Sequence, residues 1–225
     1  MGIRRDRIGL LGHSGGALLS VLVASRDPEL AFAVLLGCPA RPLPALIAAQ
    51  MAADGDGSAE TATFLGNAAA ELALESPDAA DLFDRIQKRW KDLVSTLPED
   101  ERPGAELFVA SMSRTLPVLL GSVYLRELYC FDPGPVLQRV RCPVLAVWGE
   151  YDQGRKLANS SAWEMTRHLA SGLCASFQVA QVPRVNHFLQ TCRTGGIDEI
   201  PRIEETVSPE VLGLVVEWSR SRARE

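Results

Sequence analysis

Unbroken runs of hydrophobic residues predict the strands of this chain. One run covers Phe32–Leu36 and is closed by Gly37 and Pro39, and another covers residues 142–149 and ends in a glycine turn. Runs without polar alternation are typical of parallel strands that are buried on both faces. Phe177–Val182 predicts a further strand. We therefore expect an α/β fold built on a mostly parallel sheet.

The first forty residues combine a strand, a turn and a helix. Residues 7–11 predict the strand, residues 12–16 a tight turn, and residues 17–25 a helix. That helix should end before Asp27-Pro28, because proline disfavours helical continuation. Later helices are expected at residues 158–170 and, as an amphipathic closing helix, at residues 209–221. The predicted sheet has about four strands and is flanked by helices.

The middle of the chain carries no strand signal. Residues 41–131 are rich in alanine and predict only helices, so we interpret them as a helical insertion resembling a cap. The expected helices cover residues 43–53, 59–74, 79–95, 105–113 and 118–128. The breaks between them are turn formers, namely Asp54-Gly55-Asp56-Gly57, Ser76-Pro77, Pro98 and Pro103. The predicted organisation is a first part of the core at residues 1–40, the helical cap at 41–131 and a second part of the core at 132–225.

Composition excludes several classes of partner. The chain has 225 residues, of which 47% are hydrophobic, enough to bury a sizeable core in one domain or two. The 23 Lys and Arg against 28 Asp and Glu give a net charge of −5, which argues against nucleic acid. The longest apolar stretches, residues 17–24 and 31–37, are much shorter than the roughly 20 residues of a membrane span. No apolar signal core follows the first charged residues, so a cytoplasmic location is expected.

The cysteines give no sign of a disulfide framework or a metal site. They are odd in number and widely spaced, with no C-x-x-C pair. Their positions are Cys38, Cys130, Cys142, Cys174 and Cys192. We interpret all five as reduced thiols. Cys192 lies five residues after His187, but nothing near it in the sequence would lower its pKa, which favours an ordinary thiol over a reactive one.

The turn at residues 12–16 carries the first candidate chemistry. Gly12-His13-Ser14-Gly15-Gly16 fits G-x-S-x-G and lies between a predicted strand and a predicted helix, which is the context the pattern requires. Such a turn lifts the Ser14 hydroxyl to the top of the sheet, while the helix N-terminus directs N–H groups towards a developing oxyanion. The alternative is a phosphate-binding or structural glycine turn. The lack of a following Lys and of G-x-G-x-x-G spacing disfavours that alternative.

A serine nucleophile needs a base to accept its proton. The chain has three histidines. His13 lies inside the turn, and His168 lies within a predicted helix, where a solvated or packing role is expected. His187 follows a predicted strand directly, so it is the candidate base.

The base in turn needs a carboxylate that fixes its tautomer. Asp152 occupies the turn after the strand at residues 142–149 and is the candidate acid. Glu150 is the rival, and we rank it lower because the turn after Gly149 should carry the later residue towards the base. Both the acid and the base therefore project from the carboxyl ends of predicted strands.

These segments together resemble a known family. The motif at residues 12–16, Cys142-Pro-Val-Leu-Ala-Val-Trp-Gly-Glu-Tyr-Asp152 and Val185-Asn-His-Phe-Leu-Gln190 look like the motif regions of α/β-hydrolase-fold serine esterases. Phe131-Asp-Pro-Gly-Pro-Val-Leu and Ile203-Glu-Glu-Thr-Val-Ser-Pro-Glu-Val211 resemble bacterial capped EstD-like carboxylesterases more narrowly. The resemblance implies a catalytic triad with Ser14 as nucleophile, Asp152 as acid and His187 as base, and the N–H of Gly15 in the oxyanion hole.

The position of the motif departs from that family. There, several strands precede the nucleophile elbow, whereas here the motif begins at residue 12. The resemblance therefore implies that the N-terminal strands and a second oxyanion-hole donor have no counterpart in this sequence. Loss of one donor typically lowers kcat by about 10² to 10³. The strand at residues 7–11 would then form an exposed sheet edge that invites oligomerisation or a partner segment.

Two hypotheses of different classes follow. The first is a serine hydrolase that cleaves small-molecule carboxylic esters through an acyl-enzyme, without metal or organic cofactor. The second is a catalytically impaired hydrolase that acts as a binding or interaction module, or that needs a missing N-terminal segment. The retained Ser14, Asp152 and His187 favour the first, because a silent module needs none of them.

Overall fold

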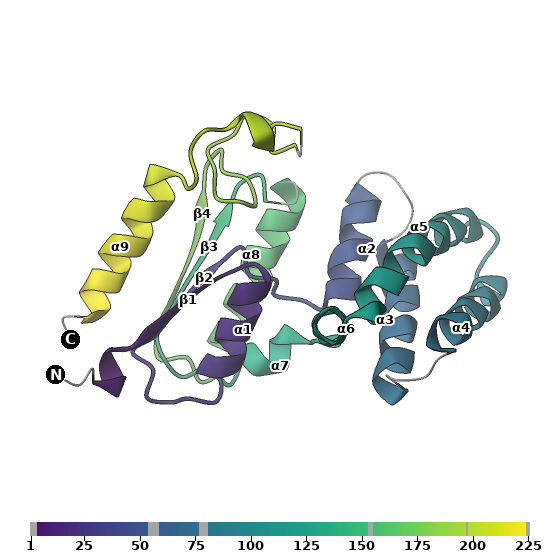
Figure 1. The fold of residues 1–225 in the computed structure, drawn as a ribbon, viewed down its shortest axis with the longest axis horizontal. Helices are drawn as coiled ribbons and strands as arrows, with labels where there is room; N and C mark the ends of the chain where they lie inside the picture. Colours follow the sequence, from purple (N-terminus) through teal and green to yellow (C-terminus); the bar gives the residue numbers. More distant parts are fainter. Residues whose placement is uncertain (1–3, 54–58, 77–80, 153–154, 197, 224–225) are drawn as a thin grey trace. The chain divides into compact units, whose positions relative to one another are not determined.

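The sheet is parallel, and its strands follow the order of the chain. The computed structural model describes residues 4–53, 59–76, 81–152, 155–196 and 198–223. The strands are β1 (Gly9–His13), β2 (Phe32–Leu36), β3 (Val144–Gly149) and β4 (Phe177–Val182). They pair in the order β1-β2-β3-β4, and each neighbouring pair is parallel (Figure 1). The predicted fold class, four parallel strands flanked by helices, is confirmed.

Burial along the strands follows their place in the sheet. All six residues of β3 are buried, as are four of the five residues of β2, because helices cover both faces of these inner strands. The edge strands β1 and β4 are more exposed. The unbroken apolar runs that predicted β2 and β3 therefore reflect burial on two faces.

Helices cover the two faces of the sheet. α1 (Gly15–Ala24) and α8 (Arg155–Ala170) pack on one face, with the short α7 (Pro133–Leu137) beside them, and α9 (Pro209–Ala223) packs on the other (Figure 1). The core under α9 includes Trp218, whose ring meets that of Phe32 edge-on at 5.8 Å between centroids. This packing fixes the sheet from which the candidate site projects.

The chain divides into two compact units, and each is described by itself. The sheet unit comprises Met1–Arg41 and Pro133–Glu225, and the helical unit comprises Pro42–Asp132. The helical unit contains α2 (Leu43–Ala53), α3 (Ala59–Glu75), α4 (Leu82–Thr96), α5 (Arg102–Gly121) and α6 (Val123–Cys130). Its core is centred on Trp90, whose indole N–H donates to the Leu65 carbonyl at 2.7 Å.

Two helices cover this part of the chain as predicted, but the predicted bounds, 105–113 and 118–128, are wrong. One helix, α5, covers Arg102–Gly121 and contains Pro117, while α6 begins only at Val123. Pro103, predicted as a break, lies in the first turn of α5, where its missing N–H has no intrahelical partner to lose. Phe108, Met112 and Leu116 are buried at four-residue spacing, so burial of this face offsets the cost of about 3 kcal/mol for the interior proline.

Smaller differences concern element ends. The first strand covers Gly9–His13 rather than residues 7–11, because a 3-10 turn occupies Arg5–Arg7. Neither α7 nor the 3-10 turn at Ile200–Arg202 was predicted. The predicted breaks at residues 54–57 and at Pro77 lie outside the described residues.

No single helix among the described residues is long and apolar enough to cross a membrane. Only α5 and α6 taken together meet the length and composition test, and they are bent by 119° at their junction.

The outer edge of β1 carries no strand partner among the described residues. Leu11 is 59% exposed at this edge. An unpaired apolar edge is a template for pairing with another chain. We propose that two copies of the chain associate through β1, which is one of the outcomes that the sequence left open for this edge.

A lysine at Leu11 should reduce this association, since strand pairing at the edge would have to bury its charge. We expect Leu11→Lys to raise the dimer dissociation constant at least about tenfold in sedimentation equilibrium. Phe64→Lys, an equivalent change at a half-exposed aromatic in the helical unit, is the matched control and should leave the constant unchanged. A wild-type chain that is monomeric at every accessible concentration would refute the proposal.

Candidate active site

The carboxyl ends of neighbouring strands assemble the candidate site. The backbone N–H of Ser14, just after β1, donates to the Leu36 carbonyl at 2.9 Å. The Gly37 N–H, after β2, donates to Val147 at 2.8 Å, and Tyr151, after β3, donates to Val185 at 2.9 Å. Each strand end is therefore bonded to its neighbour, and the loops that follow leave the sheet at one edge.

Ser14 lies in a strained turn between β1 and α1. Its φ is 52° and its ψ is −119°, a left-handed conformation that is unfavourable for a residue with a side chain. Gly12 permits this turn, because a Cβ there would overlap the backbone of Gly16. Gly15 begins α1, so its N–H belongs to the first turn, whose N–H groups have no intrahelical acceptor.

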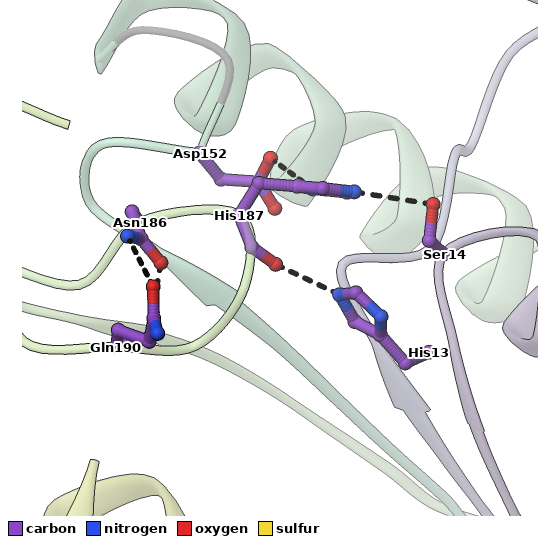
Figure 2. A network of polar contacts seen from close by, with 6 residues as sticks. All are labelled: His13, Ser14, Asp152, Asn186, His187 and Gln190. Carbon is purple, nitrogen blue, oxygen red and sulfur yellow. Dashed lines mark hydrogen bonds and ion pairs between the residues drawn. The ribbon is translucent and has the colours of Figure 1, made fainter. Parts of the chain in front are cut away.

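Three predicted side chains form one hydrogen-bonded series. His187 Nε2 lies 3.1 Å from Ser14 Oγ, and His187 Nδ1 lies 2.7 Å from Asp152 Oδ1. Figure 2 shows the His187 ring held between the carboxylate and the hydroxyl. Asp152 is 3% exposed, so its charge is shielded from water where it meets the ring. A carboxylate on Nδ1 favours the tautomer with Nδ1–H, which leaves Nε2 able to accept the serine proton.

Gly37 is a site residue that the sequence did not single out. Its φ is +54°, and a Cβ built there would lie 3.1 Å from Asp152 Oδ2 and 3.3 Å from His187 Cε1. Any side chain at this position would therefore crowd the contact between the carboxylate and the imidazole. Gly37 was visible in the sequence only as the end of a strand.

A network of amides braces the loop that carries His187. The side chain of Asn186, 2% exposed, accepts from the Gln190 N–H at 3.0 Å and donates to Gln190 Oε1 at 3.2 Å (Figure 2). Gln190 in turn donates to the Glu205 carbonyl at 3.1 Å. These bonds hold His187 in place from its own loop, whereas Asp152 holds it through the ring.

His13 also contacts this loop. Its Nε2 lies 2.8 Å from the backbone carbonyl of His187, and the two rings are 5.0 Å apart between centroids (Figure 2). The carbonyl can only accept, so His13 Nε2 carries the proton. His13 thus connects the turn of Ser14 to the loop of His187. We assign it as a positioning residue.

Loss of this connection should slow any reaction that needs the Ser14–His187 contact. His13→Ala is expected to lower kcat by about 10²-fold with little change in KM, because a displacement of about 1 Å can cost that much. His13→Gln keeps an N–H donor of similar reach and should restore most of the rate. The acid limb of the pH profile should not move in either variant, since the partner that raises the His187 pKa is Asp152. Equal losses in both variants would contradict the positioning role.

The electrostatic surroundings shift the pKa of His187. Burial of the ring lowers its pKa, but the hydrogen bond to Asp152 and the charge of that carboxylate outweigh burial, so the pKa is raised above 6.5. As the pH falls through the raised pKa, His187 becomes protonated and can no longer accept the Ser14 proton.

This shift predicts two pH dependences of opposite sign. Reactivity of Ser14 should rise with pH along a limb whose midpoint lies above 6.5. The contribution of charged His187 to stability is fully present below pH 6.5 and is lost as the pH rises through the raised pKa. Rates of labelling by a fluorophosphonate measure the first. Urea unfolding of the wild type and His187→Gln at several pH values measures the second, and a midpoint below 6.5 would contradict the assignment.

The other candidates take different positions. Glu150, the rival acid, accepts the backbone N–H of Arg184 at 2.9 Å, whereas the carboxylate bonded to His187 is that of Asp152. His168 lies in α8 beside Arg167. All five cysteines are free, and burial raises the pKa of Cys192, which fits an ordinary thiol. Among the described residues, no group of three or more His, Cys, Asp or Glu is arranged to hold a metal ion.

Several solved structures are similar to this chain. An esterase from Thermogutta terrifontis is 17% identical, with 96% of this chain and 65% of that one covered and a TM-score of 0.43. The esterase RhEst1 from Rhodococcus sp. ECU1013 is also 17% identical, with 95% and 65% covered and a TM-score of 0.37. MenH from S. aureus is 16% identical, with 93% and 68% covered and a TM-score of 0.40. The chain therefore spans about two thirds of the length of these structures.

A family model matches most of the chain. No curated protein matches the chain. The model described as the alpha/beta hydrolase family matches residues 2–193, which is well over half of the sequence and includes Ser14, Asp152 and His187. The chain belongs to the alpha/beta hydrolase family.

Proposed function

We propose that the protein is a serine hydrolase that cleaves carboxylic esters through an acyl-enzyme. The observation that carries the proposal is the series of contacts from Ser14 Oγ to His187 Nε2, 3.1 Å, and from His187 Nδ1 to Asp152 Oδ1, 2.7 Å. This is the geometry by which a base activates a serine and a carboxylate orients the base.

Ser14, His187 and Asp152 have distinct roles in the proposed reaction. Ser14 Oγ attacks the ester carbonyl as its proton passes to His187 Nε2, and the C–O bond to the alcohol then breaks as His187 returns that proton to the leaving oxygen. Water, deprotonated by His187, then attacks the acyl-serine, the bond between the acyl carbon and Ser14 Oγ breaks, and His187 returns the proton to Ser14 Oγ as the carboxylic acid is released. Asp152 stays ionised and stabilises the imidazolium formed in both steps.

The oxyanion of each tetrahedral intermediate needs N–H donors. Gly15 supplies one from the first turn of α1, where the positive end of the helix dipole adds to the stabilisation. This role for Gly15 was proposed from the sequence, and its position at the start of the helix supports it. The helical unit as a substrate-selecting cap stays a prediction.

An apolar substituent next to the reacting carbonyl would suit the surroundings of His187. Phe188 is 50% exposed, and its ring meets that of His187 edge-on at 5.7 Å between centroids. An exposed aromatic beside the base offers an apolar contact to the acyl or alcohol group of a substrate.

A matched substrate series tests the proposal. A p-nitrophenyl ester, a thioester and a p-nitroanilide with the same acyl group are offered to the wild-type chain, and intact mass spectrometry follows the acyl-enzyme. The proposal predicts an acyl adduct on Ser14 and the fastest turnover with the ester. Faster turnover of the thioester or anilide would reject ester cleavage as the function, while a folded chain with neither turnover nor an acyl adduct would reject acyl transfer altogether.

The second hypothesis, an interaction module with impaired catalysis, is favoured by one observation. Among the described residues β1 is an edge strand of the sheet, and Leu11 on it is 59% exposed. The same substrate series decides between the two, because a silent module gives neither turnover nor an adduct.

A further inference from the structure

A groove of about 740 Å³ lies in the helical unit, between α4 and α5. Its lining comes from one stripe of α4 within residues 87–95 and one stripe of α5 within residues 102–110. Eight residues of helix advance about 12 Å, which sets the length of the groove. Cavities that bind small ligands commonly measure roughly 300–1,000 Å³, so this groove has the capacity for one small molecule.

The rim of the groove is basic in a chain whose net charge is −5. Lys88 and Lys91, two of the three lysines in the sequence, line it together with Arg102, against a single acidic side chain, Glu106. Neither Lys88 nor Lys91 makes a hydrogen bond or ion pair with another described residue. Both ammonium groups are therefore available to an anion.

Arg102 differs from the two lysines. Its Nε donates to the Leu97 carbonyl at 3.0 Å and its Nη2 to the Ser95 carbonyl at 3.2 Å. These bonds hold the guanidinium against backbone carbonyls, and no carboxylate of the described residues forms an ion pair with it. The lysines, one helical turn apart on α4, are thus the natural partners of a mobile anionic group.

Apolar side chains make up another part of the lining. They are those of Val94 on α4 and of Val109 and Ala110 on α5, and the aliphatic stems of the lysines extend this surface while their charged ends stay in water. A phosphate or nucleotide would leave these apolar side chains unused. A lipid bilayer is engaged by apolar side chains that protrude from a surface, whereas these line a concavity below charged groups.

We propose that this groove binds a single-chain amphiphile with one anionic headgroup, such as a fatty acid carboxylate. The headgroup lies between Lys88 and Lys91, and the alkyl chain lies along Val94, Val109 and Ala110. The groove belongs to the helical unit and Ser14 to the sheet unit, and the proposal does not depend on the reaction proposed at Ser14.

Titration calorimetry of the full chain with sodium decanoate tests the proposal, with decan-1-ol and decyltrimethylammonium as headgroup controls. Decanoate should bind at least about tenfold more tightly than either control. Lys88→Ala with Lys91→Ala should weaken decanoate binding about tenfold, and Ala110→Trp should abolish it by filling the groove with the charges intact. Arg89→Ala is the matched control, since Arg89 is exposed on α4 but does not line the groove.

The outcomes separate this groove from other sites. Circular dichroism melting first shows that each variant is folded. Decanoate that binds the wild type and the double lysine variant equally would be bound elsewhere, the Ser14 site included, and would overturn the proposal. Equal affinity for decanoate and decan-1-ol would overturn the role of the headgroup. If Arg89→Ala weakens decanoate binding as much as the double lysine variant does, any positive charge on α4 has the same effect, which would overturn the role assigned to Lys88 and Lys91. Absence of decanoate binding to the wild type would overturn the proposal as a whole.

Discussion

Replacing Ser14 with alanine is expected to lower kcat for ester hydrolysis by about 10⁶-fold, the scale of loss when a serine nucleophile is removed. Ser14 supplies the only atom that forms a covalent bond to the substrate in the proposed reaction. His187→Ala should cause a loss of similar size, and the double variant should be hardly worse, because the two residues act as one unit. Steady-state rates with a p-nitrophenyl ester measure all three.

Ser25→Ala is the control for this experiment. Ser25 follows the same helix, and its hydroxyl donates to the Leu22 carbonyl at 2.8 Å, remote from the chemistry of Ser14. It should retain the wild-type rate. If the loss of kcat in the double variant equals the product of the losses in the two single variants, Ser14 and His187 act independently. That result would contradict the shared mechanism.

Asp152→Asn is expected to lower kcat by about 10⁴-fold while leaving the fold intact. An asparagine amide can donate to His187 Nδ1, which places the ring proton on Nε2, where it can no longer accept the proton of Ser14. The acid limb should also move to lower pH, because burial lowers the His187 pKa and the carboxylate that opposed it is gone. Both effects are read from a pH series of kcat/KM.

Glu150→Gln separates this effect from a general loss of negative charge. Glu150 lies two residues away and accepts the Arg184 N–H, so the change should leave the pH profile close to that of the wild type. If Glu150→Gln shifts the acid limb as far as Asp152→Asn does, the pKa of His187 is set by the local field as a whole rather than by the bond to Asp152.

The sequence was sufficient for the parts of the fold that depend on local pattern. Phe32–Leu36 and Phe177–Val182 were predicted to the residue, because apolar runs bounded by turn formers have few other solutions. The bounds of α5 were not predicted, because a proline indicates a helix break when only the sequence is considered. Whether the helix continues past Pro117 depends on the burial of Phe108, Met112 and Leu116, which is a tertiary effect.

In the candidate site, too, the features that follow from local sequence pattern could be predicted, and those that depend on tertiary contacts could not. Ser14, Asp152 and His187 could be found because each follows a predicted strand, and parallel strands end at one edge of a sheet. The contact of His13 with the His187 carbonyl joins residues 174 positions apart, and the proximity of Gly37 to Asp152 depends on the close packing of β2 and β3. Neither leaves a signature in the sequence.

The most direct test of the account is covalent labelling of the wild-type chain with a fluorophosphonate, followed by peptide mapping of the adduct. We expect a single adduct on Ser14, formed at a rate that rises with pH along the limb set by His187, and we expect this labelling to be lost in His187→Ala. A folded chain that stays unlabelled, or an adduct on any other residue, would contradict it.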